Sequence, residues 1–186
     1  MVAFARDCLA RRSCPCSSRL VDTLAPEEPS ILEALAAYRP PTETGHDLAL
    51  LVRHRAHPAV QRLLARLFAP QGPYGETWRA GPGELAWASV PGVLELDSVR
   101  AMLRRALQDQ TPFGVLATRG GEAWLSYGSR GHAVAVAALP AVPLDVRRCD
   151  AYASALSSQL GVALDLSWPV AQRDEAIARM LAALDR

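Results

Sequence analysis

The sequence predicts an α+β fold, in which an antiparallel β-meander of about four to five strands packs against amphipathic helices in a single domain. The first observation is the stretch 113–139, where short runs of aromatic and β-branched residues alternate with glycine-containing turns. The second is that the segments on either side repeat apolar residues three and four positions apart, which is typical of a helix with one buried face. Strands joined by tight turns are antiparallel, so the helices are expected to cover one face of the sheet.

The predicted strands follow from alternation and from the glycines that bound them. Glycine reverses the chain readily because it adopts positive φ without strain, which places turns at 119–121 and 128–131. The alternation of apolar side chains with other residues predicts one more strand before the meander and a short one after it. The full set of predicted strands is 84–90, 113–118, 122–127, 132–139 and 162–166.

The predicted helices are placed by apolar spacing, capping residues and proline. Pro58 suits a first helical position, Asp97 or Ser98 suits an N-cap, and Gly161 suits the residue after a helix. The run 48–55 is apolar, and periodicity leaves it open between helix and buried strand. The remaining predicted helices are 31–38, 58–68, 98–108, 145–160 and 174–184.

The domain organisation expected from composition is simple. Residues 1–29 contain Arg, Ser, Cys and Pro without sustained periodicity, and we expect a flexible N-terminal arm there. Residues 30–186 are expected to form the single α+β domain, with a Gly- and Pro-rich loop at 69–83. A weaker alternative for the arm is an amphipathic transit peptide, which Asp7 disfavours.

The charge balance excludes a strong general attraction to nucleic acid or to anionic membranes, since the formal net charge is +1. All twenty basic residues are arginine, and the chain has neither lysine nor asparagine. Their codons are AT-rich, so this bias indicates a GC-rich genome, and the expected source is a bacterium. No apolar run is long enough to span a membrane and the N-terminus has no apolar signal segment, so the expected location is cytoplasmic with no membrane partner.

No metal or cofactor is expected. Cys14 and Cys16 form a Cys-x-Cys pair with Cys8 nearby, but the second knuckle of a tetrahedral thiolate site is missing. We interpret the three as a surface cluster, with metal binding or redox chemistry as alternatives. His54 and His57 have the spacing of two ligands on one helical face, but Pro58 indicates that a helix starts there instead.

Catalytic motifs are missing as well. The sequence therefore favours a protein that is not an enzyme, but it does not decide this point. There is no Gly-x-Ser-x-Gly elbow, and a phosphate loop of the usual kind would need a lysine. Cys149 falls on the apolar stripe of its predicted helix, as a structural thiol does. The remaining enzymatic alternative is a site near the 69–83 loop.

The leading functional hypothesis is a non-enzymatic protein–protein interaction module of the adaptor, chaperone-like or immunity type, which self-associates as a homodimer or larger homo-oligomer. Alternation places Trp124 and Tyr127 on opposite faces of the meander, so one aromatic face is expected to be only partly covered by the chain itself. A sheet edge is the other expected contact. The predicted partner-binding residues are Tyr74, Trp78, Trp87, Trp124 and Tyr127.

The alternative from another class is nucleic-acid binding through arginine-rich helix faces. Two predicted helices carry several arginines on the side opposite their apolar stripe, and coplanar faces of this kind would follow a phosphate backbone. Neighbouring acidic residues offset much of this charge. The arginines predicted for this role are Arg62, Arg66, Arg100, Arg104 and Arg105.

Overall fold

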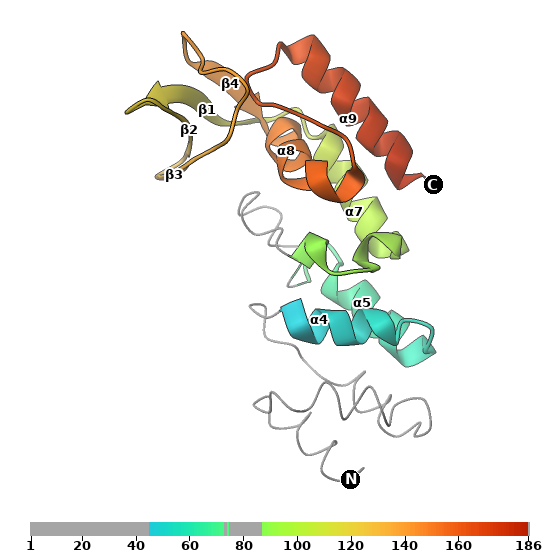
Figure 1. The fold of residues 1–186 in the computed structure, drawn as a ribbon. Coiled ribbons are helices and arrows are strands. Elements are labelled where there is room, and N and C mark those ends of the chain that lie inside the picture. The colour runs from blue at the N-terminus through green and yellow to red at the C-terminus, as the bar shows by residue number, and fades with distance from the viewer. Residues whose placement is uncertain (1–44, 73, 75–86, 186) are drawn as a thin grey trace. The chain divides into compact units, whose positions relative to one another are not determined.

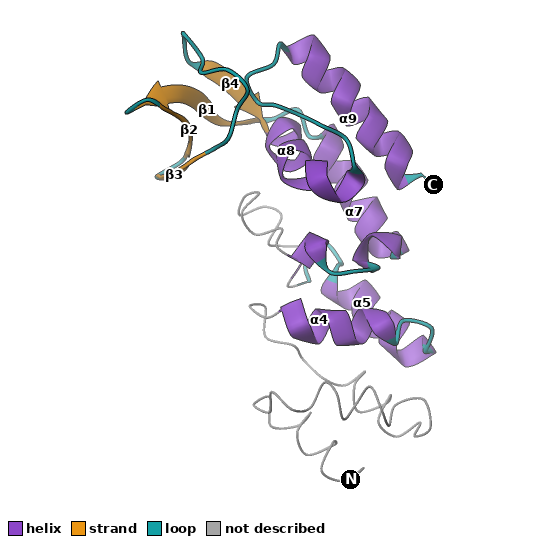
Figure 2. Ribbon diagram, viewed as in Figure 1, coloured by secondary structure: helices purple, strands orange, loops and turns teal. Residues whose placement is uncertain are grey.

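The computed structural model describes residues 45–72, 74 and 87–185 and confirms the α+β fold, with helices and a four-stranded antiparallel sheet (Figures 1 and 2). The chain divides into two compact units. The first contains the described residues up to Val99, and the second contains residues 100–185. The predicted helix 31–38 and the arm 1–29 lie outside the described residues.

The first unit is built on two helices, α4 (Gly45–Arg53) and α5 (Pro58–Leu67). The apolar run that the sequence left undecided is therefore largely helical. The prediction that a helix begins at Pro58 is confirmed, and the Nδ1 atom of His57 caps it by accepting a hydrogen bond from the Ala59 amide at 3.3 Å. Since His57 precedes the helix and His54 lies in the turn after α4, the two imidazoles do not share a helical face.

The predicted strand 84–90 is wrong over the part that the structure describes. Residues 87–89 form a 3₁₀ turn, and a second one, η2 (Val93–Glu95), follows it. The buried side chains here are Trp87, Ala88 and Val90. Ala88 and Val90 lie one and three positions after Trp87, whereas side chains on one face of a strand lie two positions apart. The Val90 amide accordingly bonds the Trp87 carbonyl at 3.1 Å, so local bonds take the place of a sheet partner.

The second unit contains the sheet, whose strand order is β3-β2-β1-β4. The strands are β1 (Pro112–Arg119), β2 (Glu122–Tyr127), β3 (Arg130–Ala133) and β4 (Leu144–Arg147). Both hairpins of the predicted meander are confirmed. Gly120, Gly121 and Gly128 have φ values of 59°, 83° and 54°, the left-handed conformations that such short connections require.

Two of the predicted strands differ from the structure. The third strand runs from Arg130 to Ala133 instead of from 132 to 139, because the chain then turns away and the Ala137 amide donates to the Asp165 carboxylate. Residues 162–166 are not a strand either, and Asp165 is held in a turn by the Ser167 amide and hydroxyl, at 2.8 and 2.6 Å.

The fourth strand, β4, occupies the first turn of the predicted helix 145–160. It pairs with β1, and α8 (Arg148–Leu160) begins directly after it. Asp150 supplies the capping interaction of this helix, since its carboxylate accepts a hydrogen bond from the Arg147 amide at 2.9 Å. Gly161 ends α8 with a φ of 63°, as predicted.

The helices of this unit lie on one side of the sheet. α8 packs against β1 and β4, and α9 (Val170–Leu184) lies along α8 (Figure 1). α9 begins four residues earlier than predicted because the Pro169 carbonyl accepts bonds from the Gln172 and Arg173 amides. α7 (Asp97–Gln108) starts in the first unit and continues into the second. Its predicted apolar stripe is buried, and consists of Val99, Met102, Leu103, Ala106 and Leu107.

Candidate interaction surface

The sheet has one covered face and one uncovered face within residues 100–185. Leu116, Leu125 and Val146 are at most 1% exposed, and they form a core with residues of α8 and of the segment that follows it. The strand register places the intervening residues on the opposite side, where Val115 is 39% exposed. We call this side the open sheet face, and it comprises Val115, Ala117, Trp124, Ser126 and Ala133, with Arg119, Glu122 and Asp145 at its margins.

Trp124 is the one large aromatic side chain of the open sheet face, and its neighbours hold it in place. It stands in a cross-strand row between Ala117 on β1 and Ala133 on β3. The guanidinium carbon of Arg119 lies 5.3 Å from the ring centroid, within range of a cation–π interaction. A Cβ atom on Gly131 would come within 2.5 Å of the indole Nε1, so the ring uses the space that this glycine leaves. These contacts define the position of the half-buried ring.

The other aromatic residues predicted to bind a partner are not among the residues of the open sheet face. Tyr127 is on the covered side of the sheet, where it stacks on Phe113 with ring centroids 4.7 Å apart. Tyr74 and Trp87 belong to the first unit and are 3% and 5% exposed. Both pack on the ring of Phe68 with centroids 5.0 Å away, while Trp78 lies outside the described residues. The predicted cluster is thus divided, and Trp124 is its member on the open sheet face.

The predicted arginines also differ in their surroundings. Arg62 and Arg66 are exposed on α5, in the first unit. Arg104 is fixed to the end of α9, where its Nε and Nη2 atoms donate to the Asp185 carboxylate at 2.9 and 2.6 Å. Arg105 is exposed on α7 and Arg100 is half-buried there. Because Arg104 is neutralised by Asp185, the α7 face carries less free positive charge than the sequence suggests.

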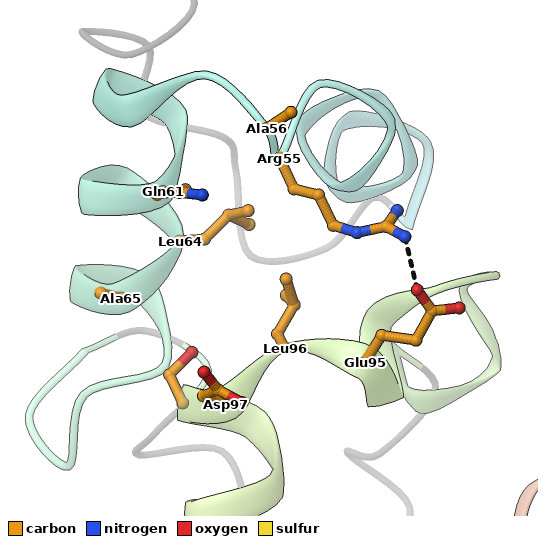
Figure 3. Close-up of a pocket in the computed structure, with 9 residues that line it drawn as sticks. Arg55, Ala56, Gln61, Leu64, Ala65, Glu95, Leu96 and Asp97 are labelled. Carbon is orange, nitrogen blue, oxygen red and sulfur yellow. Dashed lines mark hydrogen bonds and ion pairs between the residues drawn. The ribbon is translucent and has the colours of Figure 1, made fainter.

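A hollow of about 530 Å³ lies within the first unit, a size typical of small-molecule sites (Figure 3). Leu64 of α5 and Leu96 point into it, and the Arg55 guanidinium reaches across to the Glu95 carboxylate at one side. Asp97 adds a second carboxylate at the start of α7. Sequence reasoning missed this hollow because its walls come from three separated segments, and the enzymatic alternative near 69–83 lies mostly outside the described residues.

A buried ion network at the start of α8 is the second feature that the sequence did not reveal. Asp150 is fully buried and accepts hydrogen bonds from Arg147 at 2.7 and 2.9 Å and from Arg173 at 2.6 Å. Arg147 also bonds Asp174 at 2.7 Å. The hydrogen bonds that Arg147 donates to Asp150, and then the one that it donates to Asp174, raise the pKa of its guanidinium despite its partial burial. The network ties β4, α8 and α9 together, which is a structural role.

Cys149 and Tyr152 lie beside this network on the buried side of α8. Burial raises the pKa of the Cys149 thiol to about 11 and that of the Tyr152 hydroxyl to about 12. A thiol with such a pKa stays protonated at neutral pH, whereas the thiolate is the nucleophile and metal ligand. The prediction that Cys149 is a buried core residue is confirmed.

Within residues 45–72, 74 and 87–185, no three His, Cys, Asp or Glu side chains converge as the ligands of a metal ion would. The predicted cysteine cluster at Cys8, Cys14 and Cys16 lies outside these residues. No helix of the described chain has both the length and the apolar character that crossing a membrane requires. No family model, curated protein or solved structure matches the chain.

Proposed function

We propose that the protein is a cytoplasmic, non-enzymatic interaction module that associates with a second copy of itself. The observation that carries this proposal is the position of Trp124, an aromatic side chain held in a fixed orientation on a sheet face that residues 100–185 leave uncovered. Tryptophan dominates the binding energy of many protein interfaces because it buries a large apolar area with little loss of conformational freedom.

The surroundings of Trp124 support a protein partner more than a small ligand. Val115 and Ala117 of β1 and Ala133 of β3 give the face an apolar centre, which suits a second flat surface. Exposed charged residues, Arg119, Glu122 and Asp145, stand around this centre. An apolar centre with a polar rim is the usual anatomy of such an interface.

Size-exclusion chromatography with light scattering tests the proposal. Across a dilution series, the full chain is expected to give twice the 20.0 kDa chain mass at high concentration and to approach 20.0 kDa on dilution. A mass of one chain at every concentration would contradict self-association.

Nucleic acid is the competing partner, and the same preparation tests it. Fluorescence anisotropy with labelled single- and double-stranded DNA and RNA at low salt is expected to show no binding above that of a protein of similar charge. Binding that weakens steeply with salt and is lost on Arg62→Glu with Arg66→Glu would favour the α5 arginines instead. These two side chains are exposed, whereas Arg104 is already bound to Asp185.

A further inference from the structure

The hollow of the first unit combines apolar side chains with hydrogen-bond acceptors. Leu64 of α5 and Leu96 point into it from two sides (Figure 3). Leu64 is 2% exposed, so this part of the lining belongs to the packed core of the unit. The lining side chains that can accept a hydrogen bond are Gln61, Glu95, Asp97 and Ser98. A ligand with an apolar body and a polar end fits this combination.

The lining of the hollow carries more negative than positive charge. Arg55 is the one cation among the nine lining residues, and its guanidinium already donates to the Glu95 carboxylate and to the Val52 carbonyl. The carboxylate of Asp97 forms no ion pair or hydrogen bond within the part of the chain that the structure describes. Asp97 therefore provides the unmatched charge of the hollow, at the start of α7.

This arrangement favours a primary ammonium over other charged groups. An anion would meet two carboxylates and an arginine that is already paired. A divalent cation such as Ca²⁺ needs more oxygen ligands than two carboxylates supply. A quaternary ammonium is bound by aromatic rings, and none of the nine lining residues is aromatic. A primary ammonium has three N–H donors, which match the acceptors of the lining.

We propose that the hollow binds a small organic cation, a primary ammonium carried on an aryl or alkyl body. The ammonium donates to the Asp97 carboxylate, and the apolar body contacts Leu64 and Leu96. The volume of about 530 Å³ is sufficient for such a molecule. This site belongs to the first unit, and its occupancy does not depend on self-association through the open sheet face.

The first arm of the test compares probes that differ at one group. Amide NMR titration of the full chain with phenethylammonium measures the dissociation constant, and the amides of Ala65 and Ser98 are expected to shift. Phenethyl alcohol lacks the charge and phenylpropionate reverses it, and each is expected to bind at least about fivefold more weakly. Phenethyltrimethylammonium keeps the charge but has no N–H donors, so it is also expected to bind more weakly.

The second arm removes the charge that recognises the ammonium. Asp97→Asn keeps the size of the side chain and is expected to weaken phenethylammonium binding about fivefold while phenethyl alcohol binds as before. The matched control is Glu175→Gln, which removes one exposed carboxylate from α9, outside the hollow, and is expected to leave the constant unchanged.

The third arm fills the hollow. Ala65 is an exposed residue of α5 that lines it, and Ala65→Leu introduces a good helix former whose side chain takes the place of the ligand body. This variant is expected to abolish the shifts, and circular dichroism checks that it is folded. Ala101→Leu makes the same change at an exposed position of α7 that is not part of the lining, and it is expected to bind as the wild type does.

The results that would overturn the inference are distinct from those that bear on the proposed function. Absence of shifts at the lining amides with phenethylammonium would overturn the site. Equal binding of the alcohol or of the carboxylate, or full affinity in Asp97→Asn, would overturn recognition of an ammonium. Unchanged binding in Ala65→Leu would place the probe elsewhere. None of these results changes the mass that light scattering measures for the chain in the absence of a probe.

Discussion

The carboxylate of Asp150 accepts a 2.6 Å hydrogen bond from the Arg173 guanidinium, and the two side chains are 0% and 3% exposed. The same carboxylate binds Arg147, so two cations depend on one buried anion. Removing one charge from such a group strongly destabilises the fold, because the charges left behind remain buried away from water. The junction of β4, α8 and α9 is therefore expected to be sensitive to any change at Asp150.

Asp150→Asn should lower the free energy of unfolding by about 3–5 kcal/mol, since Arg147 and Arg173 would lose their shared counter-charge. Urea denaturation measures this change. Asp174→Asn is the matched control, because Asp174 also pairs with Arg147 but is 48% exposed, and it should cost less than about 1 kcal/mol. Equal effects of the two changes would contradict the dominant role of the buried carboxylate.

The Arg55–Glu95 pair beside the hollow should contribute little to stability. Its side chains are 41% and 58% exposed, so water and salt screen their attraction. Glu95→Gln is expected to change the free energy of unfolding by less than about 1 kcal/mol, and less still in high salt. A loss as large as that of Asp150→Asn in the same urea titration would show that the pair is a structural determinant of the first unit.

Gly131→Ala should displace the Trp124 ring without unfolding the sheet. The added Cβ would approach the indole Nε1 to 2.5 Å, and the ring can move because the open sheet face leaves it space. The ¹⁹F resonance of 5-fluorotryptophan at position 124, assigned with Trp124→Phe, is expected to shift. Val142→Ala provides a comparison, since Val142 is 65% exposed and lies outside the strands, and it should leave that resonance in place.

The stability of the protein should fall as the pH rises above 9. The pKa of Cys149 is raised from 9.0 to about 11 and that of Tyr152 from 10.0 to about 12, chiefly by burial. Between the unperturbed and the raised pKa of each group, the unfolded chain releases protons that the folded chain retains. The folded state therefore loses stability as the pH rises through this range. Thermal melts from pH 8 to 11 measure the slope, and Cys149→Ala should make it shallower; an unchanged slope would contradict the contribution of this thiol.

The parts of the fold that the sequence predicted well are those decided by nearby residues. Gly120, Gly121 and Gly128 specify the two hairpins locally, and Pro58 specifies where α5 begins. The strand β4 was missed because four residues are too few to display a period, and because its position depends on pairing with β1, which lies some thirty residues earlier.

The candidate surface was predictable only in part, for a related reason. Alternation along β2 correctly separates Trp124 from Leu125, but it does not reveal which side the helices cover. The burial of Tyr74 and Trp87 depends on the ring of Phe68, and the neutralisation of Arg104 depends on Asp185 near the far end of the chain. Contacts between segments so distant in sequence leave no local pattern.

The connections of the sheet also bear on how the protein reaches its native state. β1, β2 and β3 follow one another with two residues between neighbours, so their pairing requires the closure of very short loops. Folding is fast where contacts are local. We therefore expect the meander to assemble early, before α9 has left the ribosome, and to serve as the template on which β4 and α8 then dock.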